Sequence, residues 1–219
     1  MKITKYAQST VEIEHVGKKV LIDPGNYNFE PGRLSREDFK NIDVLIVTHK
    51  HADHFDLDAV KAIYAQSKPT ILTTKELVDA MANADVPARL LKIGQVEEMV
   101  GFRIVGVRAD HVVRGEVVDA FGVVVEADDK RVYHTSDTIY FEEKPSGIDI
   151  VFVPINNRGV AMDFESAAKF VRELSPKIAV PVHYDSPKDS HINPNDWVKL
   201  LTDSKIEARV MAFGEQLQI

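Results

Sequence analysis

The sequence predicts an α+β fold, a four-layer αββα sandwich in which two sheets lie inside and helices cover their outer faces. Three observations predict it. Short β-rich runs bounded by turn-forming residues dominate both ends of the chain, and helical periodicity appears between them. The run Val44–Val47 is continuously apolar, which is typical of a strand covered on both faces, and Ile148–Val153 also has the composition of a buried strand. The strand–helix alternation of the first half returns in the second, so we expect one domain over residues 1–219.

The first half supplies the elements of one sheet and its helices. Gly17-Lys18 is expected to join two antiparallel strands in a tight turn. Apolar residues at helical spacing predict a helix from Asp58, and Thr73–Glu76 has the form of a capping box before a second helix. The strands predicted here are Lys2–Tyr6, Val11–Val16, Lys19–Ile22 and Val44–Val47.

The second half repeats this alternation. An apolar stripe over Phe164–Leu174 predicts a helix, and Asn193-Pro194 has the form of an N-cap followed by proline at the first helical position. The strands predicted here are Phe102–Val107, Phe121–Val125, Arg131–His134, Ile148–Val153, Ile178–Val182 and, closing the chain, Ala208–Ala212.

Composition narrows the function before any motif is considered. The chain has no cysteine, which excludes disulfides and any cysteine-ligated metal site, so His, Asp or Glu must hold any metal. The net charge of −7 argues against a sequence-independent grip on nucleic acid and favours a small-molecule substrate. The chain also lacks a signal-peptide pattern and a membrane-length apolar run, so we expect a cytoplasmic protein without a membrane partner. Homo-oligomerisation is left open.

Four candidate metal ligands lie within six residues, directly after the buried strand Val44–Val47: His49, His51, Asp53 and His54. Residues two apart in an extended segment point to the same side, so His49 and His51 can converge on one cation. Asp53 and His54 come later, where the chain can turn toward a second cation. The alternative is a polar surface loop that happens to be rich in histidine.

A second cation needs ligands from other strands, and three other predicted strands end near such a residue. These residues are His111, Asp137 and His183. Ligands that follow separate strands at one edge of the sandwich can meet at a common point.

The order Thr48-His49-x-His51-x-Asp53-His54, then His111, Asp137 and His183, resembles the metallo-β-lactamase superfamily over nearly the whole chain. The segments around Asp137 and His183 look like the branch of metal-dependent hydrolases that contains ascorbate-6-phosphate lactonase. The resemblance implies a metallo-β-lactamase type of αββα sandwich. It also implies one metal on His49, His51 and His111, a second on Asp53, His54 and His183, and Asp137 as the bridging ligand.

Nitrogen and oxygen ligands without sulfur suit two divalent ions, with Zn²⁺ the first expectation and Mn²⁺ or Fe²⁺ the alternatives. Two such ions can share a water and lower its pKa toward about 7, which supplies a bridging hydroxide as the nucleophile. Asp53 is the expected catalytic residue, orienting the nucleophile and accepting its proton. We therefore expect a hydrolase acting on a small ester, lactone or phosphodiester, including anionic ones.

Further residues are candidates for supporting roles. Asp23 either orients a ligand imidazole or caps the turn before Pro24. His134 is either a substrate-facing acid or a hydrogen-bonded structural histidine. Substrate contacts are expected from residues near the mouth of the site, with ordinary loop polarity as the alternative: Asn156, Asn157, Arg158, Tyr184 and, on position alone, Arg114.

Three other functions remain as alternatives. A phosphodiesterase or nuclease of the same fold is disfavoured, because the sequence has neither a basic run nor an inserted nucleic-acid-binding domain. A di-iron oxidoreductase is disfavoured because that family typically has Glu at the position of His51. A non-catalytic metal-binding protein is disfavoured because all seven proposed ligands are present.

Overall fold

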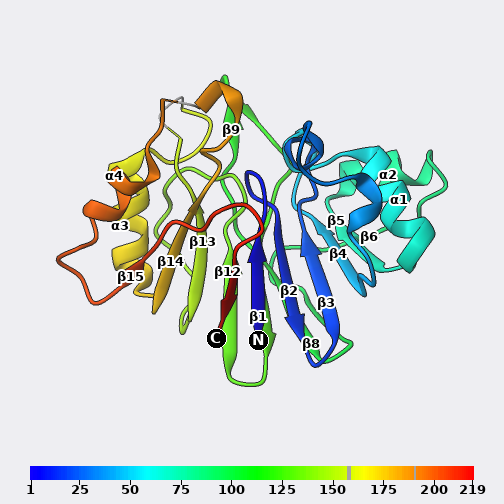
Figure 1. The fold of residues 1–219 in the computed structure, drawn as a ribbon, viewed down its shortest axis with the longest axis horizontal. Coiled ribbons are helices and arrows are strands. Elements are labelled where there is room, and N and C mark those ends of the chain that lie inside the picture. Colours follow the sequence, from blue (N-terminus) through cyan, green and yellow to red (C-terminus); the bar gives the residue numbers. More distant parts are fainter. Residues whose placement is uncertain (157–158, 190) are drawn as a thin grey trace.

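Two β-sheets lie face to face between two pairs of helices, which confirms the predicted αββα sandwich (Figure 1). The computed structural model describes residues 1–156, 159–189 and 191–219. One sheet is covered by α1 (Leu57–Ser67) and α2 (Lys75–Ala82), and the other by α3 (Phe164–Leu174) and α4 (Pro194–Lys199). Short 3₁₀ turns occupy Asn26–Phe29, Arg36–Asp38 and Pro187–Asp189.

The first sheet has the strand order β16-β1-β2-β3-β4-β5-β6 within the described residues. Its strands are β16 (Gln216–Gln218), β1 (Lys2–Lys5), β2 (Val11–His15), β3 (Lys18–Ile22), β4 (Val44–Val47), β5 (Thr70–Thr73) and β6 (Arg89–Leu90). Pairing is antiparallel from β16 to β3 and parallel from β3 to β6.

The second sheet has the order β15-β14-β13-β12-β11-β8-β7. Its strands are β15 (Glu207–Ala208), β14 (Ile178–Val182), β13 (Ile150–Pro154), β12 (Lys130–His134), β11 (Gly122–Ala127), β8 (Phe102–Val107) and β7 (Val96–Met99). Pairing is parallel from β15 to β12 and antiparallel from β12 to β7, so both sheets are mixed. A small ribbon, β9 (Val112–Val113) with β10 (Glu116–Val117), follows β8.

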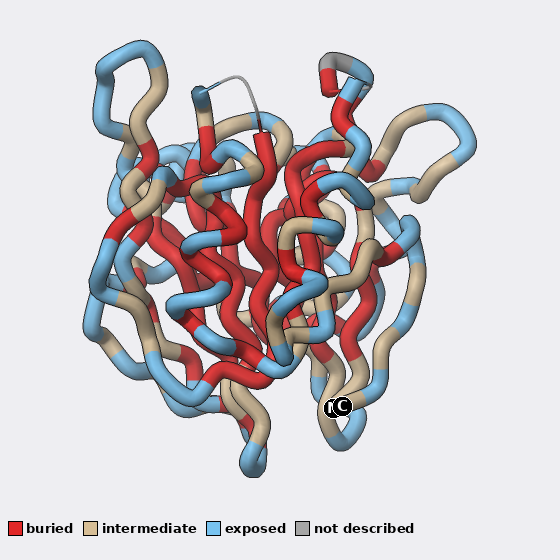
Figure 2. The backbone as a smooth tube through the Cα atoms, turned by 90° about the vertical axis from the view of Figure 1, so that its left-hand side faces the viewer, coloured by how far each residue is buried: buried red, intermediate tan, exposed pale blue. Residues whose placement is uncertain are grey.

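Strand periodicity distributes the apolar residues among three buried layers. Along β4, Val44 and Ile46 pack between the sheets, whereas Leu45 and Val47 pack beneath α1 and α2. Figure 2 shows the resulting buried centre with exposed turns around it. Burying each such side chain stabilises the fold by about 1.5–3 kcal/mol, so continuously apolar strands are favoured in the middle of the sandwich.

The structure corrects three details of the sequence interpretation. The predicted strand Ala208–Ala212 is wrong, because after β15 the chain leaves the second sheet and returns as β16 beside β1. The cap of α2 is Thr74 and not Thr73, since the Thr74 hydroxyl accepts from the Leu77 N–H at 3.4 Å. The strands β5, β6, β7, β9, β10 and β16 were not predicted; most are short or carry no apolar alternation.

Hydropathy gives no sign of a membrane span. Within the described part of the chain, none of the helices combines the length and apolar character that crossing a bilayer requires.

Candidate metal centre

The seven predicted ligands gather where several strands end. The loop after β4 carries His49, His51, Asp53 and His54, whereas His111, Asp137 and His183 follow β8, β12 and β14. The first loop leaves one sheet and the other three residues leave the second sheet. The ligands therefore face one another across the sandwich at one edge.

The first group of ligands consists of His49, His51, His111 and Asp137, whose ligand atoms all lie within 4.8 Å of one another. His51 Nδ1 lies 3.1 Å from His49 Nε2 and 3.0 Å from His111 Nε2. Two ligand atoms of a tetrahedral ion with bonds of about 2.0–2.1 Å are about 3.3 Å apart, close to these separations. The three imidazoles are therefore spaced as on one face of a coordination tetrahedron.

The second group consists of Asp53, His54, His183 and, again, Asp137. His183 Nε2 lies 3.0 Å from Asp53 Oδ2 and 3.1 Å from Asp137 Oδ2. His54 Nε2 lies 3.3 Å from Asp137 Oδ1. Asp137 thus belongs to both groups, with one carboxyl group between two sets of imidazoles.

Buried atoms in this site are left for a ligand that the protein itself does not supply. His54 Nε2 and Asp137 Oδ1 are both buried, and neither has a hydrogen-bond partner within the described residues. Buried polar atoms are normally paired, and an unpaired one is costly. A cation held by the second group would satisfy both atoms, so the residues present fit a divalent metal.

The electrostatics of the site also favour a cation. Burial lowers the pKa of His49, and it lowers that of His111 to about 4, so both rings are neutral at neutral pH. Burial opposes the charge on His183 too, but the charge of Asp137 and hydrogen bonds to Asp137 and Asp53 raise its pKa to about 10. Burial opposes ionisation of Asp53, yet its hydrogen bond with His183 and the charge of His54 lower the pKa to about 2. The first group thus offers neutral imidazoles, whereas in the second group His183 carries a proton beside ionised Asp53, and a bound cation could take the place of that proton.

Asp23 orients the second group from behind. Its Oδ2 lies 2.7 Å from Nδ1 of His54 and accepts from the Thr48 hydroxyl at 2.7 Å, while its Oδ1 accepts from the Thr48 N–H at 2.7 Å. The carboxylate is fully buried. The Asp23 carboxylate accepts a hydrogen bond from the Nδ1–H of His54, which favours the tautomer whose Nε2 lone pair faces Asp137.

His134 has a structural position. It is buried, its Nε2 lies 2.7 Å from the Ser9 carbonyl oxygen, and its Nδ1 accepts from the Ser136 N–H at 3.2 Å. Both ring nitrogens are used by backbone groups, and burial lowers its pKa. These contacts connect the end of β12 with the turn between β1 and β2 and leave no free ring nitrogen for substrate.

The backbone at the site is held in uncommon conformations. Asp23, Ser136 and His183 have φ values of 52°, 60° and 62°, in the left-handed region that non-glycine residues rarely adopt. Gly25 approaches the ligand loop so closely that a Cβ would lie 1.8 Å from the carbonyl oxygen of Asp53. The loop therefore seats against Gly25, where only glycine fits.

Two residues predicted to contact substrate do not line the cavity that the ligands line. Asn156 is buried behind His183, with its side-chain nitrogen 3.4 Å from His183 Nδ1. Tyr184 is also buried, and its ring lies under the Lys5 ammonium, 5.0 Å from it. Neither is among the described residues that line the cavity beside the ligands, and substrate contact by either residue stays a prediction.

The remaining candidates add no described contact. Arg114 occupies the exposed turn between β9 and β10 and is likewise absent from the described lining. Asn157 and Arg158 lie outside the described residues.

A cavity of about 310 Å³ opens beside the ligands. Its wall includes His51, Asp53, His111, Asp137 and His183. The sequence interpretation missed the rest of its described lining, which comprises Gln8, Asn26, Tyr27, Ala52, Val113, Val160 and Ser186. Most of these residues lie in loops, close in sequence to a predicted ligand or to Asp23. Closeness to a predicted ligand in the sequence could therefore have identified them.

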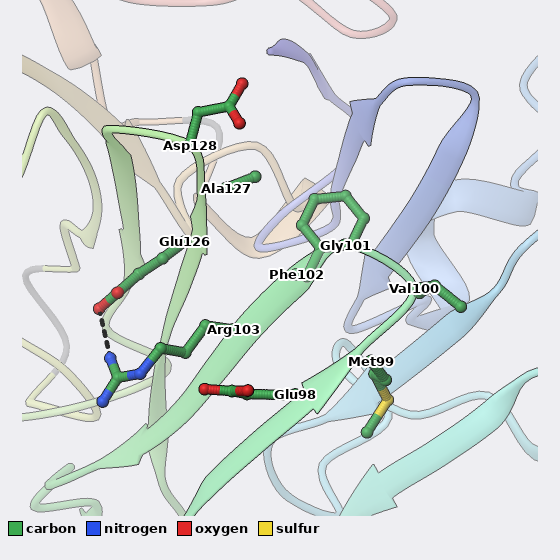
Figure 3. A pocket seen from close by; sticks show the side chains of 9 residues that line it. All are labelled: Glu98, Met99, Val100, Gly101, Phe102, Arg103, Glu126, Ala127 and Asp128. Carbon is green, nitrogen blue, oxygen red and sulfur yellow. Dashed lines mark hydrogen bonds and ion pairs between the residues drawn. The ribbon is translucent and has the colours of Figure 1, made fainter.

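A larger hollow of about 510 Å³ lies elsewhere (Figure 3). It is lined by Glu98–Arg103 and Glu126–Asp128, and it lies at the start of β8, opposite the end that leads to His111. Arg103 Nη1 donates to Glu126 Oε1 at 3.0 Å across it. Its described lining has no histidine, and the basic side chain in that lining, Arg103, is paired with Glu126, so the ligand cavity remains the candidate active site.

Comparisons with known proteins agree with this geometry. The family model for the beta-lactamase superfamily domain matches residues 2–183. A UPF0173 metal-dependent hydrolase of Staphylococcus carnosus is 29% identical, covering 100% of this chain and 99% of that protein. One of Pyrococcus abyssi is 30% identical over 92% of each chain. The solved structure of a metallo hydrolase from Ignicoccus hospitalis has a TM-score of 0.84 at 25% identity, covering 99% of this chain and 97% of that chain. The chain therefore belongs to the metallo-β-lactamase superfamily and to its metal-dependent hydrolases.

Proposed function

We propose that the chain is a binuclear metal hydrolase that cleaves a small ester, lactone or phosphodiester. One observation carries the proposal: Asp137 belongs to two separate groups of ligands, each with at least two imidazoles. A carboxylate shared in this way is the arrangement that two-metal hydrolytic sites use.

The residues divide between two ions. His49, His51 and His111 would hold one, Asp53, His54 and His183 would hold the other, and Asp137 would contact both. When bound, the two cations would supply a water activated near neutral pH and a positive charge that polarises the attacked carbonyl or phosphoryl oxygen. Ligands without sulfur suit Zn²⁺ first, with Mn²⁺ and Fe²⁺ as alternatives.

Asp53 is the proposed catalytic residue of the chain. It lines the cavity, and its side chain is 21% exposed, compared with 2% for Asp137. Its Oδ2 lies 3.0 Å from His183 Nε2. From this position Asp53 can orient the attacking water and take up its proton at a carboxylate oxygen.

The cavity supports a small substrate. About 310 Å³ is at the lower end of the usual range for small-molecule sites, about 300–1,000 Å³. A nucleic acid strand would need an extended track of cationic side chains, and the described lining offers neither Lys nor Arg.

The test combines metal analysis with a substrate panel. The protein is purified without chelator, its Zn, Mn and Fe contents are measured by mass spectrometry, and hydrolysis of a lactone, a phosphodiester and a thioester is followed. We expect close to two metal equivalents per chain and turnover of one class. Asp43→Asn is a matched control for Asp53→Asn, because Asp43 is a carboxylate that accepts from the Lys19 N–H at 2.9 Å, outside both ligand groups.

Two outcomes would contradict the proposal. Full metal occupancy with no turnover of any class would favour a non-catalytic metal-binding protein. Oxidation chemistry with bound iron would favour an oxidoreductase.

A further inference from the structure

Gln8 lies in a tight turn between β1 and β2 that holds it beside the ligand cavity. The turn is closed by two hydrogen bonds, from the Thr10 N–H to the Ala7 carbonyl at 3.0 Å and from the Tyr6 N–H to the Thr10 carbonyl at 2.8 Å. Gln8 itself has a φ of 51°, in the left-handed region. A non-glycine residue in that conformation is unfavourable unless its surroundings hold it, and such residues cluster at functional sites.

A buried ion pair holds Gln8 in this conformation. The Asp185 carboxylate accepts from the Gln8 N–H at 2.7 Å and from the Lys5 ammonium at 2.9 Å. The Lys5 side chain is only 1% exposed and lies over the ring of Tyr184. The Gln8 carbonyl accepts from the His183 N–H at 3.5 Å. Gln8 is thereby fixed to the segment that carries a proposed metal ligand.

The side-chain oxygen of Gln8 is buried and lacks a partner in the described part of the chain. The residue is 1% exposed and lines the cavity together with His51, Asp53, Asp137 and His183. Its Oε1 is buried and accepts no hydrogen bond within the described residues. A carbonyl oxygen left unpaired in a rigid wall is costly until a donor arrives, so the cavity is ready for a ligand that brings an O–H or N–H.

The rest of the described wall is uncharged apart from the ligands. Asn26, Tyr27 and Ser186 offer neutral polar groups, and Ala52, Val113 and Val160 offer apolar surface. No Lys or Arg belongs to this described lining, so a carboxylate or phosphate on the substrate would meet no side-chain cation here. Neutral hydrogen-bonding walls suit an uncharged polar molecule.

We propose that Gln8 is a substrate-binding residue that accepts a hydrogen bond from a hydroxyl or amide N–H on a small uncharged ester or lactone. This inference rests on the proposed hydrolytic function and narrows its substrate class. The probes are γ-butyrolactone, its α-hydroxy derivative, and γ-carboxy-γ-butyrolactone, which carries a negative charge.

The experiment compares Gln8→Met with the wild-type metal-loaded protein. Methionine keeps the length and the unbranched shape but accepts only weakly. Wild type is expected to prefer the α-hydroxy probe to the parent lactone by about threefold to tenfold in kcat/KM, the value of one neutral hydrogen bond. Gln8→Met is expected to bring this ratio to about one, mainly through KM, with unchanged metal content. Gln66→Met, on the exposed face of α1, is the matched control and should keep the wild-type ratio.

The selectivity ratio is measured within one sample, so a partly unfolded variant does not alter it. A Gln8→Met protein that keeps the wild-type preference overturns the inference, as does a wild type that prefers the carboxylate probe to the α-hydroxy probe. If the metal-loaded wild type hydrolyses no probe, the proposed lactone or ester hydrolysis fails. Dissociation constants of the same probes, measured by NMR titration, then decide the role of Gln8: equal values for wild type and Gln8→Met contradict it.

Discussion

Replacing Asp23 with asparagine tests whether the second ligand group depends on the tautomer of His54. Asp23 makes three contacts of 2.7 Å, with the Thr48 N–H, the Thr48 hydroxyl and His54 Nδ1. Asparagine has nearly the same shape and tolerates the left-handed φ of 52° at this position. The change therefore alters hydrogen bonding and charge with little steric effect.

The geometry determines which way the introduced amide turns. Its oxygen must face the Thr48 N–H, because the opposite orientation sets two donors against each other. Its NH₂ group then faces His54 Nδ1, which must accept. The proton of His54 moves to Nε2, the atom that faces Asp137. That nitrogen can then no longer serve as a ligand without losing its proton.

The expected effect falls mainly on the ion held by the second group, which contains His54. Loss of an outer hydrogen-bond partner typically weakens metal affinity about 10–100-fold, or about 1.4–2.7 kcal/mol. Mispairing around the buried Thr48 hydroxyl adds about 1–3 kcal/mol of lost stability. The ion held by His49, His51 and His111 should lose less affinity, because Asp23 reaches this group only through the Thr48 hydroxyl, which lies 3.2 Å from His49 Nδ1 in the described contacts.

The assay is a metal titration of apo-protein followed by calorimetry, with bound metal counted by mass spectrometry. Asp149→Asn is the matched control, since Asp149 is also a buried carboxylate that accepts from a backbone N–H, that of Arg131 at 2.8 Å, but belongs to neither ligand group. We expect the control to show the two binding events of the wild type. In Asp23→Asn, one of the two events should be weakened. Two unchanged dissociation constants in Asp23→Asn would refute the reasoning.

Four further outcomes are expected. Asp53→Asn should lower kcat about 10²–10⁴-fold in a turnover assay, the usual contribution of a general base; a smaller loss would give that role to another group. His51→Ala should lose activity and bound metal together, measured on one sample, and full metal content would contradict its place in the first group. Gly25→Ala should destabilise the protein by about 1–3 kcal/mol in urea unfolding and reduce bound metal, because its Cβ would meet the Asp53 carbonyl. Burial opposes ionisation of Asp149, but the hydrogen bond from Lys177 at 2.6 Å lowers its pKa. Its stabilisation should be complete above the unfolded pKa of about 3.9 and fade as pH falls through the lower folded value, so the gap in unfolding free energy between wild type and Asp149→Asn should close in acid.

The sequence predicted the central strands well because the residues of each strand indicate by themselves that the strand is buried. Val44–Val47, Phe102–Val107 and Ile178–Val182 have the predicted bounds, and each is a short run that must be covered. Loops directly after such strands carry the ligands, so the ligand residues could be proposed from position alone.

Other features depend on partners distant in the chain. β16 is a three-residue edge strand, Gln216–Gln218, with one apolar residue, which is too short a pattern to predict a strand without its partner β1. Tyr184 stands next to a proposed ligand, but the ammonium of Lys5 covers its ring. The position of Gln8 depends on Asp185, a residue 177 positions away. Local patterns carry no information about such contacts.

Because the ligands come from both sheets, the metal centre joins the two halves of the sandwich. His49 to His54 follow β4 of the first sheet, and His111, Asp137 and His183 follow β8, β12 and β14 of the second. Bound cations would act as a reversible cross-link between two otherwise apolar layers, so chelation should let the halves separate more often. Amide hydrogen exchange in β4 and β12 should therefore be faster in the metal-free protein than in the metal-loaded protein, because the two sheets separate more often.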